Sequence, residues 1–135
     1  MPASLVFVDT TAWYALLDRK DAHHAAAKRF QAVNRRPFAT SNYIVDELLT
    51  LAKRCLGADA AVRMGEQLFA QQIARLYTIT PDLEQAAWKI FQRFADKGFS
   101  FTDCTSFALM EQAGIDVAFA FDLHFHQYGR FTVLP

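Results

Sequence analysis

Two continuous apolar runs, each followed at once by an aspartate, constrain the fold of this chain most strongly. Residues 5–8 precede Asp9, and residues 117–121 precede Asp122. An apolar run without polar alternation is typical of a strand that is covered on both faces, as in a parallel sheet. Binding sites in such sheets form just beyond the carboxyl ends of the strands, so we expect Asp9 and Asp122 to lie at one edge.

Helical and extended patterns alternate along the rest of the chain. Predicted helices cover residues 12–17, 22–34, 42–56, 58–73, 81–97 and 103–113, and further predicted strands cover 37–40, 75–79 and 131–134. Asp21, Ser41 and Thr102 are the predicted N-caps, and Thr80 with Pro81 is a clear start signal. This alternation predicts an α/β fold, a three-layer α/β/α sandwich with a central, mostly parallel sheet.

The length of 135 residues fits a single domain, residues 1–135, with one core. A hydrophobic content of 53%, with 13 Phe, indicates a packed globule and not a disordered segment. Fourteen basic residues balance 14 acidic ones, so the bulk charge favours no partner. Basic residues can still cluster on one face, and nucleic acid therefore remains open as a partner.

No segment of the sequence indicates export or a membrane. Residues 1–8 lack the basic start of a signal peptide, and no apolar run approaches the roughly 20 residues of a membrane span. We therefore expect a cytoplasmic protein without membrane contact. Cys55 and Cys104 each fall within a predicted helix, and two reduced thiols are favoured over a disulfide.

Helical geometry separates two neighbouring acids, Asp46 and Glu47. One stripe of the predicted helix faces the core: Ile44, Leu48, Leu51 and Cys55. At about 100° per residue, Glu47 lies roughly 60–70° from the centre of this stripe, at its border, whereas Asp46 points away from it. Glu47 can therefore reach a cleft at the edge of the core, and we assign Asp46 to the solvent.

Each acid also has a purely structural interpretation. Asp9 could cap a helix, Asp103 could favour the positive end of its helix, Asp122 could be a turn residue, and Glu47 could be solvated. Taken together, two strands that end in Asp at one sheet edge favour a site. Clustered carboxylates repel one another unless a cation neutralises them. Ligands that are all oxygen select Mg²⁺ or Mn²⁺ over zinc.

Five segments, in this order, resemble a PIN domain. They are residues 6–12 around Asp9, Asp21 with His24, residues 44–48 around Glu47, residues 101–108 around Asp103, and residues 120–125 around Asp122. The likeness covers nearly the whole chain. Its length and the lack of extra domains resemble the VapC-type ribonuclease toxins of toxin–antitoxin pairs.

The resemblance implies an endoribonuclease that depends on Mg²⁺ or Mn²⁺ and hydrolyses RNA phosphodiester bonds with a metal-activated water. It implies Asp9, Glu47, Asp103 and Asp122 as the metal-binding and catalytic acids. Family members often place a hydroxyl near the site, at positions that match Thr10 or Thr11 and Thr105 or Ser106. The resemblance also implies a homodimer and an antitoxin protein as the natural inhibitor.

Other side chains have weaker signals. Lys89, Arg93 and Lys97 follow at i, i+4 and i+8, which could line a helical face for an RNA backbone, although an ordinary solvated face is favoured. His124 and His126 match no zinc motif, and surface or loop roles are favoured over metal binding. Further aromatic residues, Trp88 and Phe107 among them, fit a core or an interface. Trp13 and Tyr14 are the best candidates for a dimer interface.

Two other functions compete with the nuclease. Metal-dependent phosphohydrolases of another α/β fold also place an Asp after the first strand, but the nucleophilic type needs a second Asp two residues later, where Thr11 stands. A non-catalytic RNA- or protein-binding module predicts loss of the acids, and all four are present. Within the nuclease hypothesis, a toxin is favoured over a housekeeping RNA-processing enzyme.

Overall fold

A parallel sheet forms the centre of the computed structural model, which describes residues 4–135. Within that range its five strands are β1 (Val6–Val8), β2 (Phe38–Ser41), β3 (Arg75–Tyr77), β4 (Val117–Phe119) and β5 (Thr132–Leu134). They lie in the order β3-β2-β1-β4-β5, and every neighbouring pair is parallel. The predicted parallel sheet is therefore confirmed. Residues 1–3 of the segment in which we predict no signal peptide lie outside the described residues.

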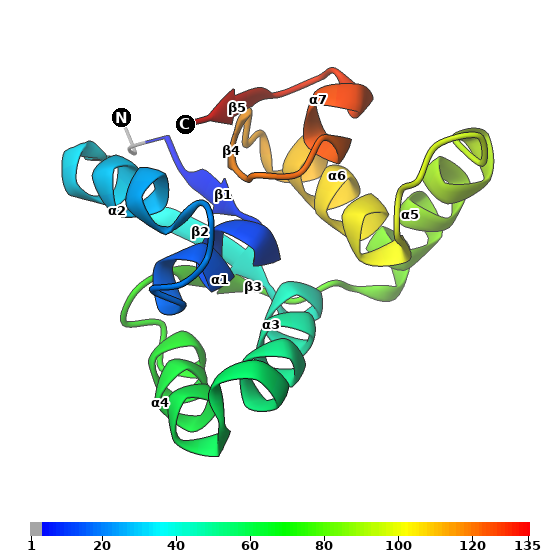
Figure 1. The fold of residues 1–135 in the computed structure, drawn as a ribbon. Coiled ribbons are helices and arrows are strands. Elements are labelled where there is room, and N and C mark those ends of the chain that lie inside the picture. Colours follow the sequence, from blue (N-terminus) through cyan, green and yellow to red (C-terminus); the bar gives the residue numbers. More distant parts are fainter. Residues whose placement is uncertain (1–3) are drawn as a thin grey trace.

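Seven helices of the described chain cover the sheet. They are α1 (Thr10–Leu17), α2 (His24–Val33), α3 (Asn42–Leu56), α4 (Ala58–Phe69), α5 (Pro81–Arg93), α6 (Phe101–Ala113) and α7 (His124–Tyr128). Connections between parallel strands are right-handed, so steps in opposite directions across the sheet place their helices on opposite faces. Accordingly α1 to α4 lie on one side and α5 to α7 on the other (Figure 1), which confirms the predicted α/β/α layers.

The strand order reverses direction between β1 and β4. The chain moves from β1 outward to β2 and β3, and then returns to place β4 on the other side of β1. The carboxyl ends of β1 and β4 are adjacent, because Val8 pairs with Phe119 and the Asp9 N–H donates to the Phe119 carbonyl oxygen at 3.0 Å. Such a reversal opens a crevice at the strand ends, where α/β proteins bind their ligands.

Local signals explain most helix boundaries. The Ser41 side chain accepts a hydrogen bond from the Ile44 N–H, and the Thr80 side chain accepts one from the Leu83 N–H, so both predicted caps are confirmed. Gly57 ends α3 with a φ of 96°, a conformation that glycine adopts without strain. Gly114 ends α6 in the left-handed conformation, as the sequence predicts.

Two predicted caps are wrong. Helix α2 begins only at His24, and Asp21 instead accepts from the His23 N–H at 2.8 Å and closes the preceding turn. Helix α6 begins at Phe101, two residues before the predicted start, because Ser100 and Asp103 form a capping box. Thr102 therefore lies inside the helix.

Helices α4 and α5 are shorter than predicted, and the structure adds one helix, α7. Helix α4 ends at Phe69 and not at residue 73. The Ala70 N–H donates to the Glu66 carbonyl oxygen, and the chain then turns at Gln71, which has a positive φ of 54°. Helix α5 ends at Arg93, four residues before the predicted end. Helix α7 was not predicted, because its five residues are too few to show a helical period.

The core consists mainly of large aromatic and aliphatic side chains. Phe7, Trp13, Phe107, Phe119 and Phe125 are among its largest fully buried members. Trp13 is only 2% exposed and its Nε1–H donates to Thr40 Oγ1 at 3.2 Å. The prediction of Trp13 as an interface residue is therefore wrong, because a side chain enclosed within its own chain cannot contact a partner.

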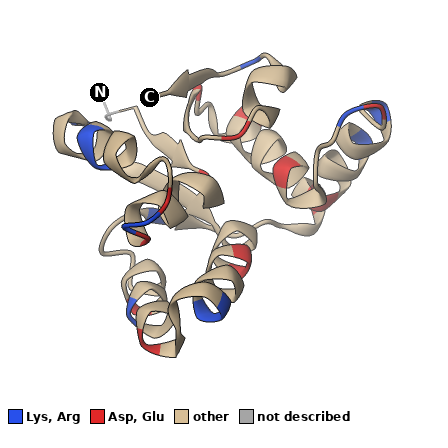
Figure 2. Cartoon of the chain, in the orientation of Figure 1, with Lys and Arg blue, Asp and Glu red and all other residues tan. Residues whose placement is uncertain are grey.

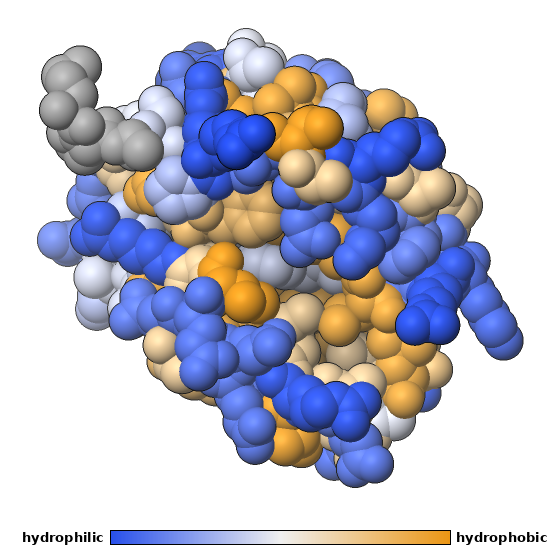
Figure 3. Space-filling model, turned by 90° about the vertical axis from the view of Figure 1, so that its left-hand side faces the viewer, coloured by the Kyte–Doolittle hydropathy of each residue, from blue (hydrophilic) through white to orange (hydrophobic). Residues whose placement is uncertain are grey.

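Neither cysteine forms a disulfide, as predicted: Cys55 is exposed in α3 and Cys104 is buried in α6. No helix within residues 4–135 combines the length and apolar character needed to cross a membrane. Figure 3 shows hydrophobic patches between hydrophilic residues on the side that lies to the left in Figure 1. Exposed apolar side chains in α2 and α4 include Val33, Val62 and Phe69.

Candidate metal and active site

A cavity of about 660 Å³ opens beside the carboxyl ends of β1 and β4. All four predicted acids line it: Asp9, Glu47, Asp103 and Asp122. They come from the end of β1, from α3, from the first turn of α6 and from the loop after β4. Figure 2 shows acidic positions of these segments around the centre of the molecule, whereas most basic positions lie toward its periphery. The fold thus brings together residues that are up to 113 positions apart in the sequence.

Asp9 is fixed by the residue two positions later. Its Oδ2 accepts from Thr11 Oγ1–H at 2.7 Å and from the Thr11 N–H at 3.3 Å, which also caps α1. Thr11 Oγ1 in turn accepts from the Phe121 N–H at 3.0 Å. Thr11 therefore ties the end of β1 to the chain just after β4, and it holds the Asp9 carboxylate at the junction. The structural interpretation of Asp9 as a cap is confirmed for the same carboxylate that lines the cavity.

Burial of Asp9 has an electrostatic cost. The residue is only 2% exposed, and this burial, together with the negative charge of Asp122, raises the pKa of Asp9 from 3.8 to about 7. The pKa of Asp122 is raised as well, first by burial and then by the charge of Asp103. The carboxylates therefore repel one another, and a cation bound between them would offset this repulsion.

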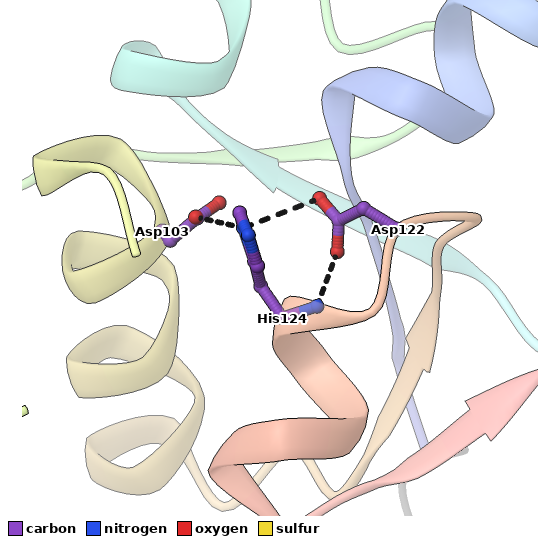
Figure 4. Close-up of side chains that lie close together, drawn as sticks. All are labelled: Asp103, Asp122 and His124. Atoms are coloured by element: carbon purple, nitrogen blue, oxygen red, sulfur yellow. Dashed lines mark hydrogen bonds and ion pairs between the residues drawn. The ribbon is translucent and has the colours of Figure 1, made fainter. Parts of the chain in front are cut away.

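Asp103, Asp122 and His124 form a compact group (Figure 4). One ligand atom from each lies within 4.8 Å of the other two. His124 Nδ1–H donates to Asp103 Oδ2 at 2.6 Å, and the His124 backbone N–H donates to Asp122 Oδ1 at 3.1 Å. One residue thus holds both carboxylates, through its ring and through its backbone.

Asp103 has a second structural task. Its Oδ2 accepts from the Ser100 N–H at 2.9 Å, while its own N–H donates to Ser100 Oγ at 3.0 Å. This capping box fixes the start of α6 and, with it, the orientation of a carboxylate that is 7% exposed. Asp103 therefore belongs to the capping box of α6 and also lines the cavity.

Helix α3 forms one wall of the cavity, and both of its neighbouring acids, Asp46 and Glu47, lie in that wall. The cavity is lined by Asp46, Glu47, Thr50, Leu51 and Arg54 of this helix. Glu47 lines the cavity as expected, but Asp46 lines it too, and both side chains are exposed. The helix phase does not exclude Asp46, because the cavity is wide enough to take in side chains from more than one stripe of the helix.

The predicted hydroxyls divide into two pairs. Thr10 and Thr11 line the cavity, and the buried Thr10 Oγ1 has no hydrogen-bond partner among the described residues. Thr105 and Ser106 are buried in α6 and do not line the cavity. Thr105 donates to the Thr102 carbonyl oxygen of its own helix at 2.7 Å. The cavity surface therefore offers only the first pair.

The predicted basic stripe is not a helical face. Helix α5 ends at Arg93, so Lys97 lies beyond it and its Nζ is 3.6 Å from Asp96 of the same loop. Lys89, Arg93 and Lys97 do not line the cavity. Within residues 4–135 the cavity wall contains one Lys or Arg, which is Arg54 of α3.

Sequence reasoning undervalued two residues of this region. His124, for which the sequence favours a surface or loop role, contacts Asp103, and His23 lines the cavity. The position of His124 two residues after Asp122 was an available signal, since the backbone N–H of such a residue commonly returns to the aspartate. No pattern in the sequence indicates that its ring also reaches α6.

The chain matches the family model described as "PIN domain" over residues 6–130. It is 39% identical over 131 residues to a curated protein of Mycobacterium tuberculosis named "23S rRNA-specific endonuclease VapC20", across 97% of this chain and 99% of the relative. The chain belongs to the PIN-domain family. The predicted resemblance is confirmed, and with it the prediction of a nuclease.

Solved structures agree with this PIN domain throughout its length. The crystal structure of M. tuberculosis VapC20, titled a "Sarcin-Ricin loop cleaving toxin", has a TM-score of 0.89 at 39% identity and covers 96% of this chain and 99% of its own. A toxin–antitoxin complex from Klebsiella pneumoniae has a TM-score of 0.70 at 15% identity and covers 96% of both chains. That distant similarity concerns the fold alone. Membership in the PIN-domain family excludes the alternative of a phosphohydrolase of another α/β fold.

Proposed function

We propose that this PIN domain is the toxin of a toxin–antitoxin pair, a Mg²⁺- or Mn²⁺-dependent endoribonuclease that cuts the sarcin–ricin loop of 23S rRNA. The observation that carries the proposal is the convergence of Asp9, Glu47, Asp103 and Asp122 on one cavity at the switch point of the sheet. The proposed RNA target is that of the relative with 39% identity over 97% of this chain, whose crystal structure is titled a sarcin–ricin loop cleaving toxin. We treat residues 1–135 as a single nuclease domain, since the family match spans 6–130.

The donor set fits a hard divalent cation. Carboxylate oxygens of Asp9, Asp103, Asp122 and Glu47 would hold it, and the unpartnered Thr10 hydroxyl is a further oxygen at the cavity. A bound Mg²⁺ or Mn²⁺ supplies Lewis-acid activation of water and positive charge for the phosphoryl transition state. The raised pKa values of Asp9 and Asp122 support the same conclusion, because a cation relieves the repulsion that causes them in part.

The protein's own residues orient these ligands. Thr11 fixes the Asp9 carboxylate, Ser100 fixes Asp103 at the start of α6, and His124 bridges Asp103 and Asp122. All of these contacts are present in the protein alone. Such preorganisation lowers the cost of placing charge where the transition state develops it.

The main test is the cleavage of an RNA hairpin that carries the sarcin–ricin sequence. The wild type should cut it with Mn²⁺ and should lose activity in EDTA. Asp9→Asn should lower the rate by about 10²- to 10³-fold, in line with the loss of one electrostatic group at a reaction centre. Asp116→Asn is the matched control, since Asp116 is exposed and lies at the amino end of β4, whereas the cavity lies at the carboxyl end. Full cleavage after exhaustive chelation would reject the metal-dependent mechanism.

A second comparison decides between the two acids of α3. We propose Glu47 as the ligand, so Glu47→Gln should cost about 10²-fold in rate and Asp46→Asn should stay near the wild type. Both side chains are exposed and line the same cavity, so the two variants are matched in environment. The reverse ranking would assign the metal to Asp46.

An antitoxin and a second copy of the chain are the proposed protein partners. Apolar side chains of α2 and α4 remain exposed, which is typical of surfaces that a protein partner covers. Light scattering of the purified chain tests the homodimer, and co-purification with the product of an adjacent small reading frame tests the antitoxin. Lys89, Arg93 and Lys97 stay proposed contacts to the RNA backbone, outside the cavity.

A further inference from the structure

His23 and Phe121 form a pair of stacked rings in the wall of the cavity. Their ring centroids are 4.5 Å apart and their planes differ by 10°. Both residues line the cavity, and the His23 side chain is exposed while Phe121 is partly buried. One face of the imidazole therefore lies on Phe121, and the side chain as a whole remains exposed to the solvent.

The pair is close to the candidate metal ligands. Phe121 directly precedes Asp122, and its N–H donates to Thr11 Oγ1, which donates to Asp9 Oδ2. A group stacked on these rings would therefore lie next to the reacting phosphate.

The turn that carries His23 is held on both sides. The His23 N–H donates to Asp21 Oδ1 at 2.8 Å, and His24 Nδ1–H donates to the carbonyl oxygen of Ala15 in α1 at 2.7 Å. The His23 carbonyl oxygen accepts from the Ala27 N–H at 2.9 Å. His23 is thus presented by a fixed turn, which reduces the entropy lost when a ligand stacks on it.

Arg54 lies in the α3 wall of the same cavity. Within residues 4–135 its guanidinium has no carboxylate within ion-pair distance, although Asp46 and Glu47 belong to the same helix. A cavity of about 660 Å³ is within the range of small-ligand sites and is large enough for a nucleotide. An aromatic face and a free guanidinium are the two groups that recognise the base and the phosphate of a single-stranded nucleotide.

We propose that His23, supported by Phe121, is the stacking platform for one unpaired RNA base beside the cleaved bond, and that Arg54 binds the phosphate of that nucleotide. This inference rests on the proposed ribonuclease function and specifies which RNA feature the site recognises. A paired base cannot use the platform, because its face is already covered by its neighbours in the helix. The platform therefore selects an unpaired nucleotide, and it does so through stacking and not through base-specific hydrogen bonds.

The test uses sarcin–ricin hairpins that each carry one abasic nucleotide near the cleaved bond. With the wild-type protein and Mn²⁺, one abasic position should lower kcat/KM by about 5- to 150-fold, the range that corresponds to the loss of one base–aromatic stack. His23→Ala should show the same loss on the intact hairpin, and that abasic position should cost it nothing further. His23→Phe should behave like the wild type, and His126→Ala, at an exposed histidine of α7, is the control.

Three results would overturn the proposal. The first is an abasic effect of equal size in the wild type and in His23→Ala. The second is a loss in His23→Phe as large as in His23→Ala, which would assign the imidazole a hydrogen-bonding role. The third is a His23→Ala variant that loses its antitoxin and keeps its RNA activity, which would make the ring pair a protein contact.

The platform and the proposed function can fail separately. Binding of the same hairpins to Asp9→Asn and to the double variant Asp9→Asn/His23→Ala is measured by fluorescence anisotropy. A wild type that leaves the hairpin uncut would reject the RNA target, whereas the abasic effect on binding still tests the platform. An unchanged Mn²⁺-induced thermal shift in His23→Ala shows that its loss of activity does not come from displaced metal ligands.

Discussion

Asp103 in the first turn of α6 and Phe107 in the middle of the same helix are both buried, but among opposite kinds of side chain. At its start, Asp103 lies beside Asp122 and His124, and burial together with the negative charge of Asp103 raises the pKa of Asp122 and of Asp9. Farther along, Phe107 stacks on Tyr128 with ring centroids 4.3 Å apart and contacts Phe125 edge to face at 5.0 Å. One helix thus links a region that lowers the free energy of unfolding of the metal-free protein to a region that raises it.

This difference shows how a small chain can hold several acids in its interior. Burial of charge without a counterion is unfavourable, and packing elsewhere must exceed that cost. The aromatic cluster around Phe107 also includes Phe99, with ring centroids 5.1 Å apart. Phe99 lies next to Ser100, the residue that caps α6 and orients Asp103. The packing that stabilises the fold therefore also fixes the position of the acidic end.

The largest effect is expected when the aromatic cluster around Phe107 is disrupted. Phe107→Ala deletes a fully buried ring and should lower the free energy of unfolding by about 3–5 kcal/mol, measured by urea denaturation. Phe69→Ala is the control, since Phe69 is 62% exposed, and its effect should stay within about 0.5 kcal/mol. Equal effects of the two substitutions would mean that the aromatic cluster does not stabilise the fold.

The buried carboxylates near the start of α6 should make the stability of the protein depend on pH. Burial and the charge of Asp122 raise the pKa of Asp9 to about 7, whereas the unfolded chain releases this proton near 3.8. Between these values the folded, metal-free protein binds more protons than the unfolded one, so its stability should fall as the pH rises. We expect a loss on the order of 1–4 kcal/mol between pH 4 and 8.

Urea denaturation in EDTA at a series of pH values measures this loss, and Asp9→Asn removes the titrating group. The variant should therefore show a flatter pH profile and should exceed the wild type in stability at pH 8. Excess Mn²⁺ should raise the stability of the wild type at pH 8, and it should not raise that of Asp9→Asn. A wild type that gains stability from pH 4 to 8 in EDTA would contradict the buried repulsion.

His124 lies between the two regions and should have an intermediate effect. Its ring contacts Phe99 edge to face at 5.6 Å on one side and donates to Asp103 on the other. His124→Phe preserves the packing and the backbone contact to Asp122 but removes the Nδ1–H donor. Loss of a group that orients a metal ligand typically weakens metal binding by about 10- to 100-fold. Calorimetric titration with Mn²⁺ measures this change, with His126→Phe as the control, and an unchanged affinity would exclude a role for the ring.

Much of the fold is predictable because the relevant signals are local. Apolar runs mark β1 and β4, and the acids that follow them identify the sheet edge at which Asp9 and Asp122 meet. The role of a residue is not predictable from the sequence where two interpretations fit it equally well. Ser100 and Thr102 can both cap a helix, and only the reciprocal bond with Asp103 decides for Ser100. The stretch around Trp13 is apolar on all sides, so it gives no helical stripe that shows which residues are buried.

Details of the site depend on contacts that are distant in sequence. His124 meets Asp103 because α7 packs on α6, and α7 itself is too short to leave a periodic pattern. The breadth of the cavity, which admits Asp46 beside Glu47, depends on the spacing between α3 and the strand ends. The sequence indicates which side chains can bind a metal, whereas the packing of helices determines which of them share a cavity.

The smallest expected effect separates the two roles of Asp103, with the two members of its capping box as the matched pair. Ser100→Ala removes the acceptor of the Asp103 N–H and should destabilise the protein by about 1 kcal/mol. It leaves the Asp103 carboxylate in place, so most of the Mn²⁺-induced rise in melting temperature should remain. Asp103→Asn loses a favourable charge at a helix start, worth roughly 0.3–1 kcal/mol, but it also relieves repulsion with Asp122.

The melting temperature of metal-free Asp103→Asn should therefore stay near that of the wild type, because these two changes oppose each other. Its Mn²⁺-induced rise should largely vanish, since ligand stabilisation follows RT ln(1 + [L]/Kd) and Kd increases when a ligand is lost. Thermal melts of both variants, each in EDTA and in excess Mn²⁺, distinguish the roles. A drop of similar size in both variants, with the Mn²⁺ response intact in both, would leave Asp103 as a helix cap alone. The metal would then depend on Asp9, Glu47 and Asp122, and the contrast between the start and the middle of α6 would be one of packing and not of ligand binding.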